Sequence, residues 1–339
     1  FDGQRALMKG NQSVRISRSR LANFHHEDYA DLDSRHAVPS DIYSKFNSRE
    51  KQFVRNRLWV PIFEKALQEK RRRADRIRYL CFPSPACAFV KQLLGMKLIS
   101  EDTMVVGIEP NEHYHIRILE TFASRFKKGR YEILRGRFED LVNTPELKEK
   151  FPFDILELDF PEPFFSITPK KESRLLAAIE TSLIEQTRSN KPCYLITGFK
   201  IGGKLPSPLS SSYASLEDFL TKEIIHRENT ILGDETLTAF LKSGPRQGRY
   251  AEWCCLYATP LVIIRHTSGI CEVALHDVPY THVSASEGGT SRLVSYAFVC
   301  KPRRGVVGQG TLEKSLKEAI SKTARTVWYR SRSQLETFR

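Results

Sequence analysis

The middle of this chain alternates short apolar segments with segments of helical period, and that alternation limits the folds open to it. The apolar segments predict strands at 77–82, 104–109, 131–135, 154–159 and 193–197. The segments between them predict helices at 86–98, 111–127, 141–149 and 170–189. Strands and helices in this order are typical of a parallel sheet with helices packed on its faces. We therefore predict a doubly wound α/β domain.

The pattern changes after the fifth strand. A loop rich in Gly, Pro and Ser occupies 202–212, and a helical region is expected at about 215–243. Two longer strands are then predicted at 253–265 and 291–301, with a short one near 270–275. Because no helix separates these late strands, they favour an antiparallel pair at the sheet edge. The expected fold is a doubly wound, mostly parallel seven-stranded sheet with a late antiparallel strand pair.

Extensions flank this Rossmann-like domain, which we place at 77–300. Residues 1–76 read as a basic N-terminal arm and a helical region, with a helix at 48–75 that Pro61 divides into two pieces. Residues 301–339 form a basic C-terminal tail that includes an amphipathic helix at 311–326.

Positive charge gathers in these extensions. The chain carries 53 Lys and Arg against 40 Asp and Glu, a net charge of +13. The two extensions hold the whole excess, at +7 each, and the central domain is close to neutral. Clustered Lys and Arg attract phosphate backbones. The expected nucleic-acid contacts are Arg71, Arg72, Arg73, Lys301, Arg303 and Arg304. A solvated surface without a partner is the alternative.

Composition also bears on compartment and on metal binding. No run approaches the roughly 18 apolar residues of a transmembrane helix, and the opening residues do not form a basic-then-apolar leader. The seven cysteines include no Cys-x-x-Cys pair and no zinc-like spacing. We expect a cytoplasmic protein with reduced cysteines, no metal and no membrane partner.

Ligands of open α/β sheets bind beyond the carboxyl ends of the strands. The first predicted strand ends in Phe-Pro-Ser-Pro-Ala-Cys, where nucleotide-binding folds normally carry glycines. The small residues Ser84 and Ala86 beside Pro83 form a proline turn that could replace the glycines, in front of free helix N–H groups. Equally, such a loop could have lost its ligand.

The next two loops carry acidic and aromatic residues. Glu109 ends the second strand, where a carboxylate can accept hydrogen bonds from a ribose diol, or can instead favour the dipole of the next helix. After the third strand, Phe138 could stack on an adenine while Glu139 or Asp140 accepts from its amino group. Asp140 is also a natural helix N-cap.

The fourth strand ends in the segment Asp-Ile-Leu-Glu-Leu-Asp-Phe-Pro-Glu-Pro-Phe-Phe, residues 154–165. Strand alternation places Glu157 and Asp159 on one face of the sheet. Because a buried charge without partners is costly, these carboxylates favour a functional role.

Taken in order, Ile108-Glu109, Phe138-Glu139 and Asp159-Phe-Pro-Glu-Pro-Phe resemble the motifs of class I S-adenosylmethionine-dependent methyltransferases, over about 77–300. The last motif is similar to the Asp-Pro-Pro-Tyr loop of enzymes that methylate base amino groups, with Phe160 and Glu162 as departures. The resemblance implies S-adenosylmethionine as cofactor, bound by Pro83, Ser84, Ala86, Glu109, Phe138 and Glu139. It also implies a substrate side with Asp159, Pro161 and Phe164, where Asp159 accepts from the amine and Phe164 or Phe165 stacks on a flipped base.

Two other functions stay open. The chain could be a non-catalytic scaffold that keeps the fold and binds nucleic acid or protein through its basic ends. It could also be a metal-dependent nuclease, because Glu109, Glu157, Asp159 and Glu162 are expected at one sheet edge and carboxylates bind Mg²⁺. Cofactor binding and metal-dependent cleavage separate the three hypotheses.

Overall fold

The computed structural model describes residues 48–71, 77–164, 169–201, 248–286, 289–303, 308–323, 325–330 and 334–337. Several predictions lie outside these residues, namely the N-terminal arm up to residue 47, the helix at 215–243, and Phe165, Arg72, Arg73 and Arg304.

The predicted parallel strands are all present. They are β1 (Arg78–Cys81), β2 (Met104–Glu109), β3 (Tyr131–Arg135), β4 (Ile155–Pro163) and β5 (Cys193–Ile201). Their order across the sheet is β3-β2-β1-β4-β5, and each pair of neighbours is parallel. This order places the carboxyl ends of β1 and β4 side by side at the centre of the sheet, as in doubly wound nucleotide-binding folds.

An antiparallel region follows β5. The long strand β8 (Gly289–Pro302) runs antiparallel to β5. Its two ends pair with β6 (Cys271–Leu275) and β7 (Tyr280–Ser286), so that these two short strands together occupy one strand position. The expected late antiparallel pairing is therefore confirmed. The sheet continues through β9 (Val327–Arg330) and β10 (Gln334–Thr337), which the sequence pattern did not predict.

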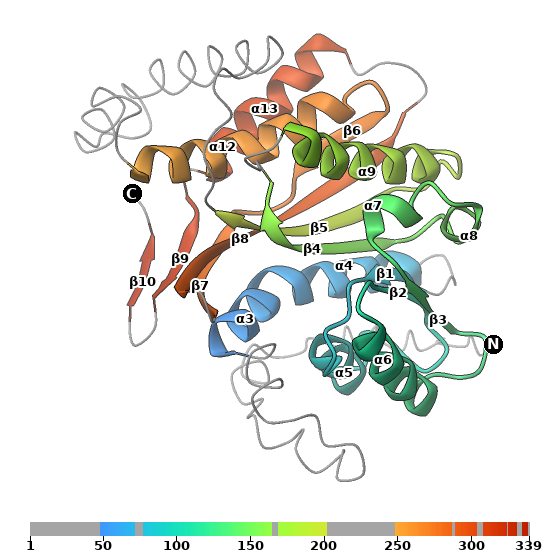
Figure 1. The fold of residues 1–339 in the computed structure, drawn as a ribbon. Coiled ribbons are helices and arrows are strands. Elements are labelled where there is room, and N and C mark those ends of the chain that lie inside the picture. Colours follow the sequence, from blue (N-terminus) through green and yellow to red (C-terminus); the bar gives the residue numbers. More distant parts are fainter. Residues whose placement is uncertain are drawn as a thin grey trace, which may run out of the picture. The chain divides into compact units, whose positions relative to one another are not determined.

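Helices cover both faces of the sheet (Figure 1). One face carries α9 (Pro169–Thr187), α12 (Gly248–Thr267) and α13 (Gln309–Thr323). The opposite face carries α3 (Arg49–Val54), η2 (Arg55–Trp59), α4 (Val60–Arg71), α5 (Ala88–Gly95) and α6 (Glu112–Arg125). Two short helices, α7 (Phe138–Leu141) and α8 (Pro145–Lys148), lie between β3 and β4.

The strand predicted at 253–265 is wrong, because this segment lies within helix α12. Its apolar residues continue around the whole helix, which packs against α9, α13 and β6. A segment that is apolar on every side has no helical period and resembles a buried strand. Pro260 lies inside the helix and cannot donate to the carbonyl of Leu256. The hydroxyl of Tyr296 donates to that carbonyl instead, at 2.7 Å.

The N-terminal helical region is continuous rather than divided at Pro61. It widens into the π-helical turn η2, in which the N–H of Val60 donates to the carbonyl of Arg55 five residues earlier. The widened turn directly precedes Pro61, which has no N–H to donate. The prediction of a break was therefore wrong, and the proline is accommodated by a change of helix type.

Candidate functional site

A cavity of about 570 Å³ lies beyond the carboxyl ends of β1, β2 and β4, on the face covered by α3, η2 and α5. Its volume is within the range of small-molecule sites, roughly 300–1,000 Å³. Among the predicted site residues, those that line it are Pro83, Ser84, Glu109, Phe138, Glu139 and Asp159.

The glycine-free loop after β1 forms a tight turn. The N–H of Cys87 donates to the carbonyl of Ser84 at 2.7 Å, and Cys87 has a left-handed conformation with a φ of 49°. The neighbouring strand β2 does carry a glycine, Gly107, close to this turn. A Cβ at this position would lie 3.0 Å from Pro83 Cγ and 2.7 Å from Ile133 Cδ1. Gly107 thus makes room for the proline turn. Within the described residues, the buried Ser84 Oγ has no hydrogen-bond partner.

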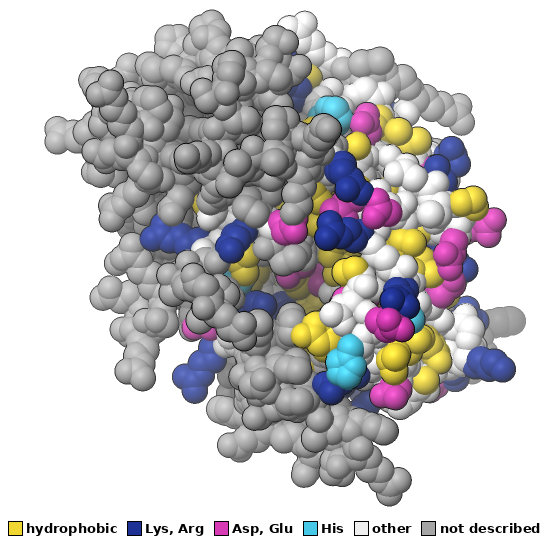
Figure 2. All heavy atoms as spheres, in the orientation of Figure 1, with side chains coloured by type: hydrophobic (Ala, Val, Ile, Leu, Met, Phe, Trp, Pro, Cys, Tyr) yellow, Lys and Arg dark blue, Asp and Glu magenta, His cyan; other side chains and the backbone are white. Residues whose placement is uncertain are grey.

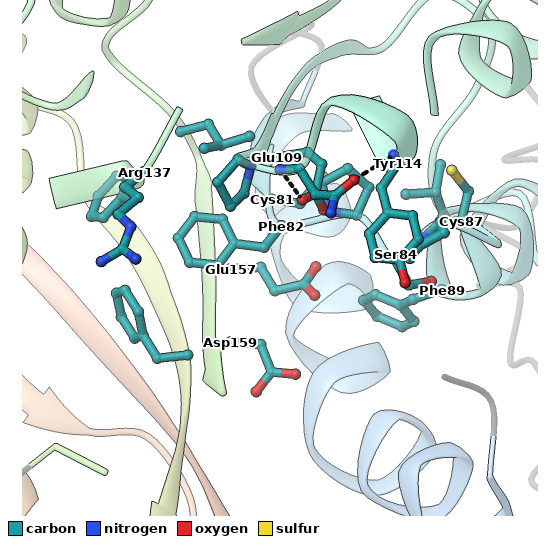
Figure 3. A pocket seen from close by; sticks show the side chains of 18 of the residues that line it. Cys81, Phe82, Ser84, Cys87, Phe89, Glu109, Tyr114, Arg137, Glu157 and Asp159 are labelled. Atoms are coloured by element: carbon teal, nitrogen blue, oxygen red, sulfur yellow. Dashed lines mark hydrogen bonds between the residues drawn. The ribbon is translucent and has the colours of Figure 1, made fainter. Parts of the chain in front are cut away.

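Glu109 lies at the end of β2, half-buried at the cavity wall (Figure 3). Its Oε1 accepts a hydrogen bond from the N–H of Asn111 at 2.7 Å, and Asn111 caps α6. Burial raises the pKa of this carboxyl, while the Asn111 bond and His115 oppose the shift. Glu109 therefore supports the turn before α6 with one oxygen and keeps the other available for a ligand.

Aromatic rings form the apolar end of the cavity. Phe82 lies with its ring centroid 5.4 Å from that of Phe138 and 5.3 Å from that of Phe160. Phe160 in turn stacks on Phe199 at 5.5 Å. Phe82, Phe138 and Phe160 all line the cavity. They offer an apolar surface to a planar ring.

Glu157 and Asp159 project from β4 into the cavity (Figure 3). The hydroxyl of Tyr79 donates to Oε2 of the buried Glu157. Burial raises the pKa of Glu157 well above its ordinary value, and the neighbouring Asp159 raises it further. Burial also raises the pKa of Asp159, against the lowering effect of Lys51 and Arg55. Both carboxylates are thus held where ionisation is costly.

Gly198 makes room for the Asp159 side chain. The two residues are register partners on β5 and β4, and a Cβ at Gly198 would overlap the Asp159 carboxylate. Directly after Asp159 the pairing with β5 shifts, so that the next register pair is Pro163 with Lys200. This irregularity, like other bulges beside functional sites, redirects side chains, and Phe160 and Glu162 line the cavity.

Two cavity residues come from outside the predicted domain. Lys51 of α3 and Arg55 of η2 are four positions apart on one helical face, and both line the cavity. Arg55 is buried, with its guanidinium 5.6 Å from the Phe89 ring centroid. No sequence pattern indicated this role, because two basic residues on an amphipathic helix are typical of a solvated face.

Some predicted site residues do not line the cavity. Phe164 is buried and packs edge-on against Phe199 at 4.9 Å, because β4 continues to Pro163 and directs the next side chain into the core. The stacking role predicted for Phe164 is therefore corrected.

Ala86 is fully buried behind the loop. Asp140 lies within α7, whose N-cap is Arg137, and pairs with Arg174. The side chain of Pro161 is not described.

Two of the predicted nucleic-acid contacts, Lys301 and Arg303, are described, and neither lines this cavity. Lys301 and Arg303 are exposed at the end of β8, and Arg303 pairs with Glu272 at 3.1 Å. Arg71 ends α4, and its side chain is not described. On the face in Figure 2, basic and acidic side chains alternate among the described residues. The role of these residues stays a prediction.

In the part of the chain that the structure describes, no three His, Cys, Asp or Glu side chains form a group that could hold a metal ion. Among the helices of the described ranges, none has both the length and the apolar composition needed to cross a membrane.

No family model matches this chain, and neither does any curated protein. Solved structures with some likeness include TrmK of M. capricolum in complex with S-adenosyl-homocysteine, with 6% identity, a TM-score of 0.34, and coverage of 69% of this chain and 66% of that one. An O-methyltransferase family protein from Burkholderia thailandensis has 11% identity and a TM-score of 0.32, covering 76% and 60%. A conserved hypothetical protein of Streptococcus pyogenes has 16% identity and a TM-score of 0.27, covering 40% and 73%.

This chain spans less than two thirds of the length of the first two of these structures. Likeness at such TM-scores assigns neither the fold nor the function of this chain. The fold is therefore defined by its own strand order and pairing.

Proposed function

We propose that this protein is an S-adenosylmethionine-dependent methyltransferase that acts on nucleic acid, at an amino group of a base. The observation that carries the proposal is one cavity shared by Glu109 at the end of β2 and Asp159 at the end of β4. A cofactor held near the first residue would lie in the same space as a substrate held near the second.

The residues of the cavity fit the cofactor. Ser84 Oγ is a buried polar atom whose partner among the described residues is missing, and a bound ligand would supply it. Glu109 would accept from a ribose hydroxyl, and Phe138 beside Glu139 would flank the adenine. When bound, S-adenosylmethionine supplies an activated methyl group on a positively charged sulfur.

The substrate side fits an exocyclic amine. Asp159 accepts a hydrogen bond from such an amine and orients its lone pair towards the methyl group. Phe160 lines the cavity beside Asp159 and takes the contact with the base that the sequence had suggested for Phe164. The basic extensions, with Lys301 and Arg303, would bind the phosphate backbone outside the cavity.

Calorimetric titration with S-adenosylmethionine and with S-adenosylhomocysteine tests the cofactor site. We expect binding to the intact chain and a loss of about tenfold or more in Glu109→Gln, because a hydrogen bond to a charged group contributes about 1.5–3 kcal/mol. Glu112→Gln is the matched control, since Glu112 is exposed on α6 and does not line the cavity. No binding by the folded chain would reject the enzyme and favour the scaffold.

Transfer of labelled methyl groups from S-adenosylmethionine to total RNA or to genomic DNA tests the substrate class. Asp159→Asn should retain cofactor binding and lose transfer. If neither nucleic acid accepts a methyl group while the cofactor binds, the nucleic-acid assignment fails. Cleavage of either polymer that depends on Mg²⁺ would favour the nuclease.

A further inference from the structure

Glu157 is a buried carboxyl of the cavity that the proposed chemistry does not use. It lies two residues before Asp159 on β4, and both side chains point from the strand into the cavity (Figure 3). Residues two apart on one face of a parallel strand have Cα atoms about 6.6 Å apart. A single planar ligand can therefore contact both carboxyls at once.

Tyr79 of β1 holds one oxygen of Glu157. Its hydroxyl donates to Glu157 Oε2, and its fully buried ring packs edge-on against Phe63 of α4, with 4.9 Å between the ring centroids. Among the described residues, Glu157 makes no other hydrogen bond and no ion pair. Its second oxygen, Oε1, is therefore left for a ligand in the cavity.

The surroundings of the two carboxyls favour different protonation states. Burial raises the pKa of Glu157 well above its ordinary value and Asp159 raises it further, with Arg55 opposing the shift. Burial also raises the pKa of Asp159, but both Lys51 and Arg55 lower it. Because two like charges in one buried site oppose each other's ionisation, the pair holds a proton more readily on Glu157 than on Asp159. Since Oε2 accepts from Tyr79, that proton belongs on Oε1.

We propose that the acid form of Glu157 donates a hydrogen bond to the ring nitrogen beside the target amine, while Asp159 accepts from the amine. This inference rests on the proposed function, because it names the base. Enzymes that act on flipped bases read the Watson–Crick edge. On that edge, adenine and cytosine carry their amine beside a ring nitrogen that accepts, whereas the adjacent ring nitrogen of guanine carries a hydrogen. Two donors would then face each other, so the site selects adenine or cytosine and rejects guanine.

The base that receives the methyl group is the first test. Total RNA and genomic DNA are incubated with labelled S-adenosylmethionine and digested, and their nucleosides are separated. We expect the label in adenine or cytosine nucleosides. Label on guanosine would reject the inference and leave the methyltransferase in place.

Variants of Glu157 separate base recognition from a structural role. Glu157→Gln keeps an acceptor for Tyr79 and a donor for the base, so methyl transfer should be largely retained. Glu157→Met lacks the donor and should transfer about tenfold more slowly or worse, with the affinity for S-adenosylmethionine unchanged. Glu69→Met is the matched control, since Glu69 also accepts from a tyrosine hydroxyl, that of Tyr194 at 3.0 Å, and does not line the cavity. Equal losses in Glu157→Gln and Glu157→Met would contradict the acid form.

Calorimetry with nucleosides tests the contact without methyl transfer. Saturating S-adenosylhomocysteine fills the cofactor side, so that an added nucleoside reports on the side of Asp159. Deaza analogues that replace the accepting nitrogen by C–H, 1-deazaadenosine and 3-deazacytidine, should bind about tenfold more weakly than their parent nucleosides. The difference should disappear in Glu157→Met, and 7-deazaadenosine, which keeps the acceptor, should bind like adenosine.

The two proposals fail in different ways. A chain that distinguishes adenosine from 1-deazaadenosine through Glu157 but binds no S-adenosylhomocysteine keeps the base contact and rejects the proposed function. Cofactor binding together with equal affinity for parent and deaza nucleosides, or with no nucleoside binding at all, rejects the role of Glu157.

Discussion

The two walls of the cavity differ in composition and in origin. One, the loop wall, consists of Pro83 and Ser84 from the loop after β1, Glu109 at the end of β2, and Phe138 at the start of α7. The other, the charged wall, consists of Lys51, Arg55, Glu157, Asp159 and Lys200. The loop wall comes from consecutive β-α units of the chain, whereas the charged wall combines an N-terminal helix with two neighbouring strands. A ligand that needs both walls is recognised only after the helix has packed on the sheet.

The largest effect is expected from a methyl group placed in the charged wall. In Gly198→Ala the new Cβ would overlap the Asp159 carboxylate and displace it. A displacement of about 1 Å near the reacting groups can reduce the rate of methyl transfer about 100-fold. Transfer of labelled methyl to total RNA and DNA measures the rate, and calorimetry should find the affinity for S-adenosylmethionine unchanged. A parallel loss of cofactor affinity would show that the two walls are not separate.

The same substitution in the loop wall should affect the cofactor instead. Gly107→Ala places a Cβ 2.7 Å from Ile133 Cδ1 and 3.0 Å from Pro83 Cγ, which pushes the proline turn outwards. We expect S-adenosylmethionine to bind about tenfold more weakly, equivalent to about 1.4 kcal/mol. Overpacking should also lower the free energy of unfolding by about 1–3 kcal/mol. Gly269→Ala, where nothing lies within 4 Å of the new Cβ, is the control for both measurements.

Buried carboxyls in the charged wall should make stability depend on pH. The pKa of Glu157 is raised in the folded protein, whereas the unfolded chain ionises near 4.5. The folded state therefore binds more protons, and the free energy of unfolding falls as pH rises from about 4.5 towards the raised pKa. Glu157→Gln should flatten this part of the profile, measured by urea unfolding at several pH values.

The hydroxyl that supports Glu157 gives a second measurement of the same wall. Tyr79→Phe should cost about 1 kcal/mol, the usual contribution of one hydrogen bond. An unchanged pH profile in Glu157→Gln would contradict a raised pKa of Glu157 in the folded protein.

The smallest effect is expected outside both walls. Lys301→Gln should change the free energy of unfolding by less than about 0.5 kcal/mol, because Lys301 is exposed. It should lower the salt dependence of nucleic-acid affinity by about one unit of slope if Lys301 contacts a phosphate. Lys128→Gln, exposed in the central domain, serves as the comparison in filter-binding measurements at several salt concentrations. Equal slopes in both variants would remove Lys301 from the interface.

Sequence patterns predicted the loop wall better than the charged wall. Glu109 ends one predicted strand and Phe138 comes shortly after another, so their placement at the carboxyl edge needs only the rule for parallel sheets. Asp159 was predicted in the same way. The position of Phe164 was predicted wrongly, because the irregular pairing after Asp159 changes which side chains face the cavity. No local sequence pattern indicates that change.

By itself, the sequence determined the alternation of strands and helices, and with it the parallel core and the edge at which ligands bind. It did so because strand and helix periods are local properties of neighbouring residues. The tertiary structure alone decided that the apolar segment of α12 is a helix, that Lys51 and Arg55 enter the cavity, and that α3 packs against β7. These outcomes depend on which surfaces pack together, and residues more than 200 positions apart in the chain come into contact only in the folded protein.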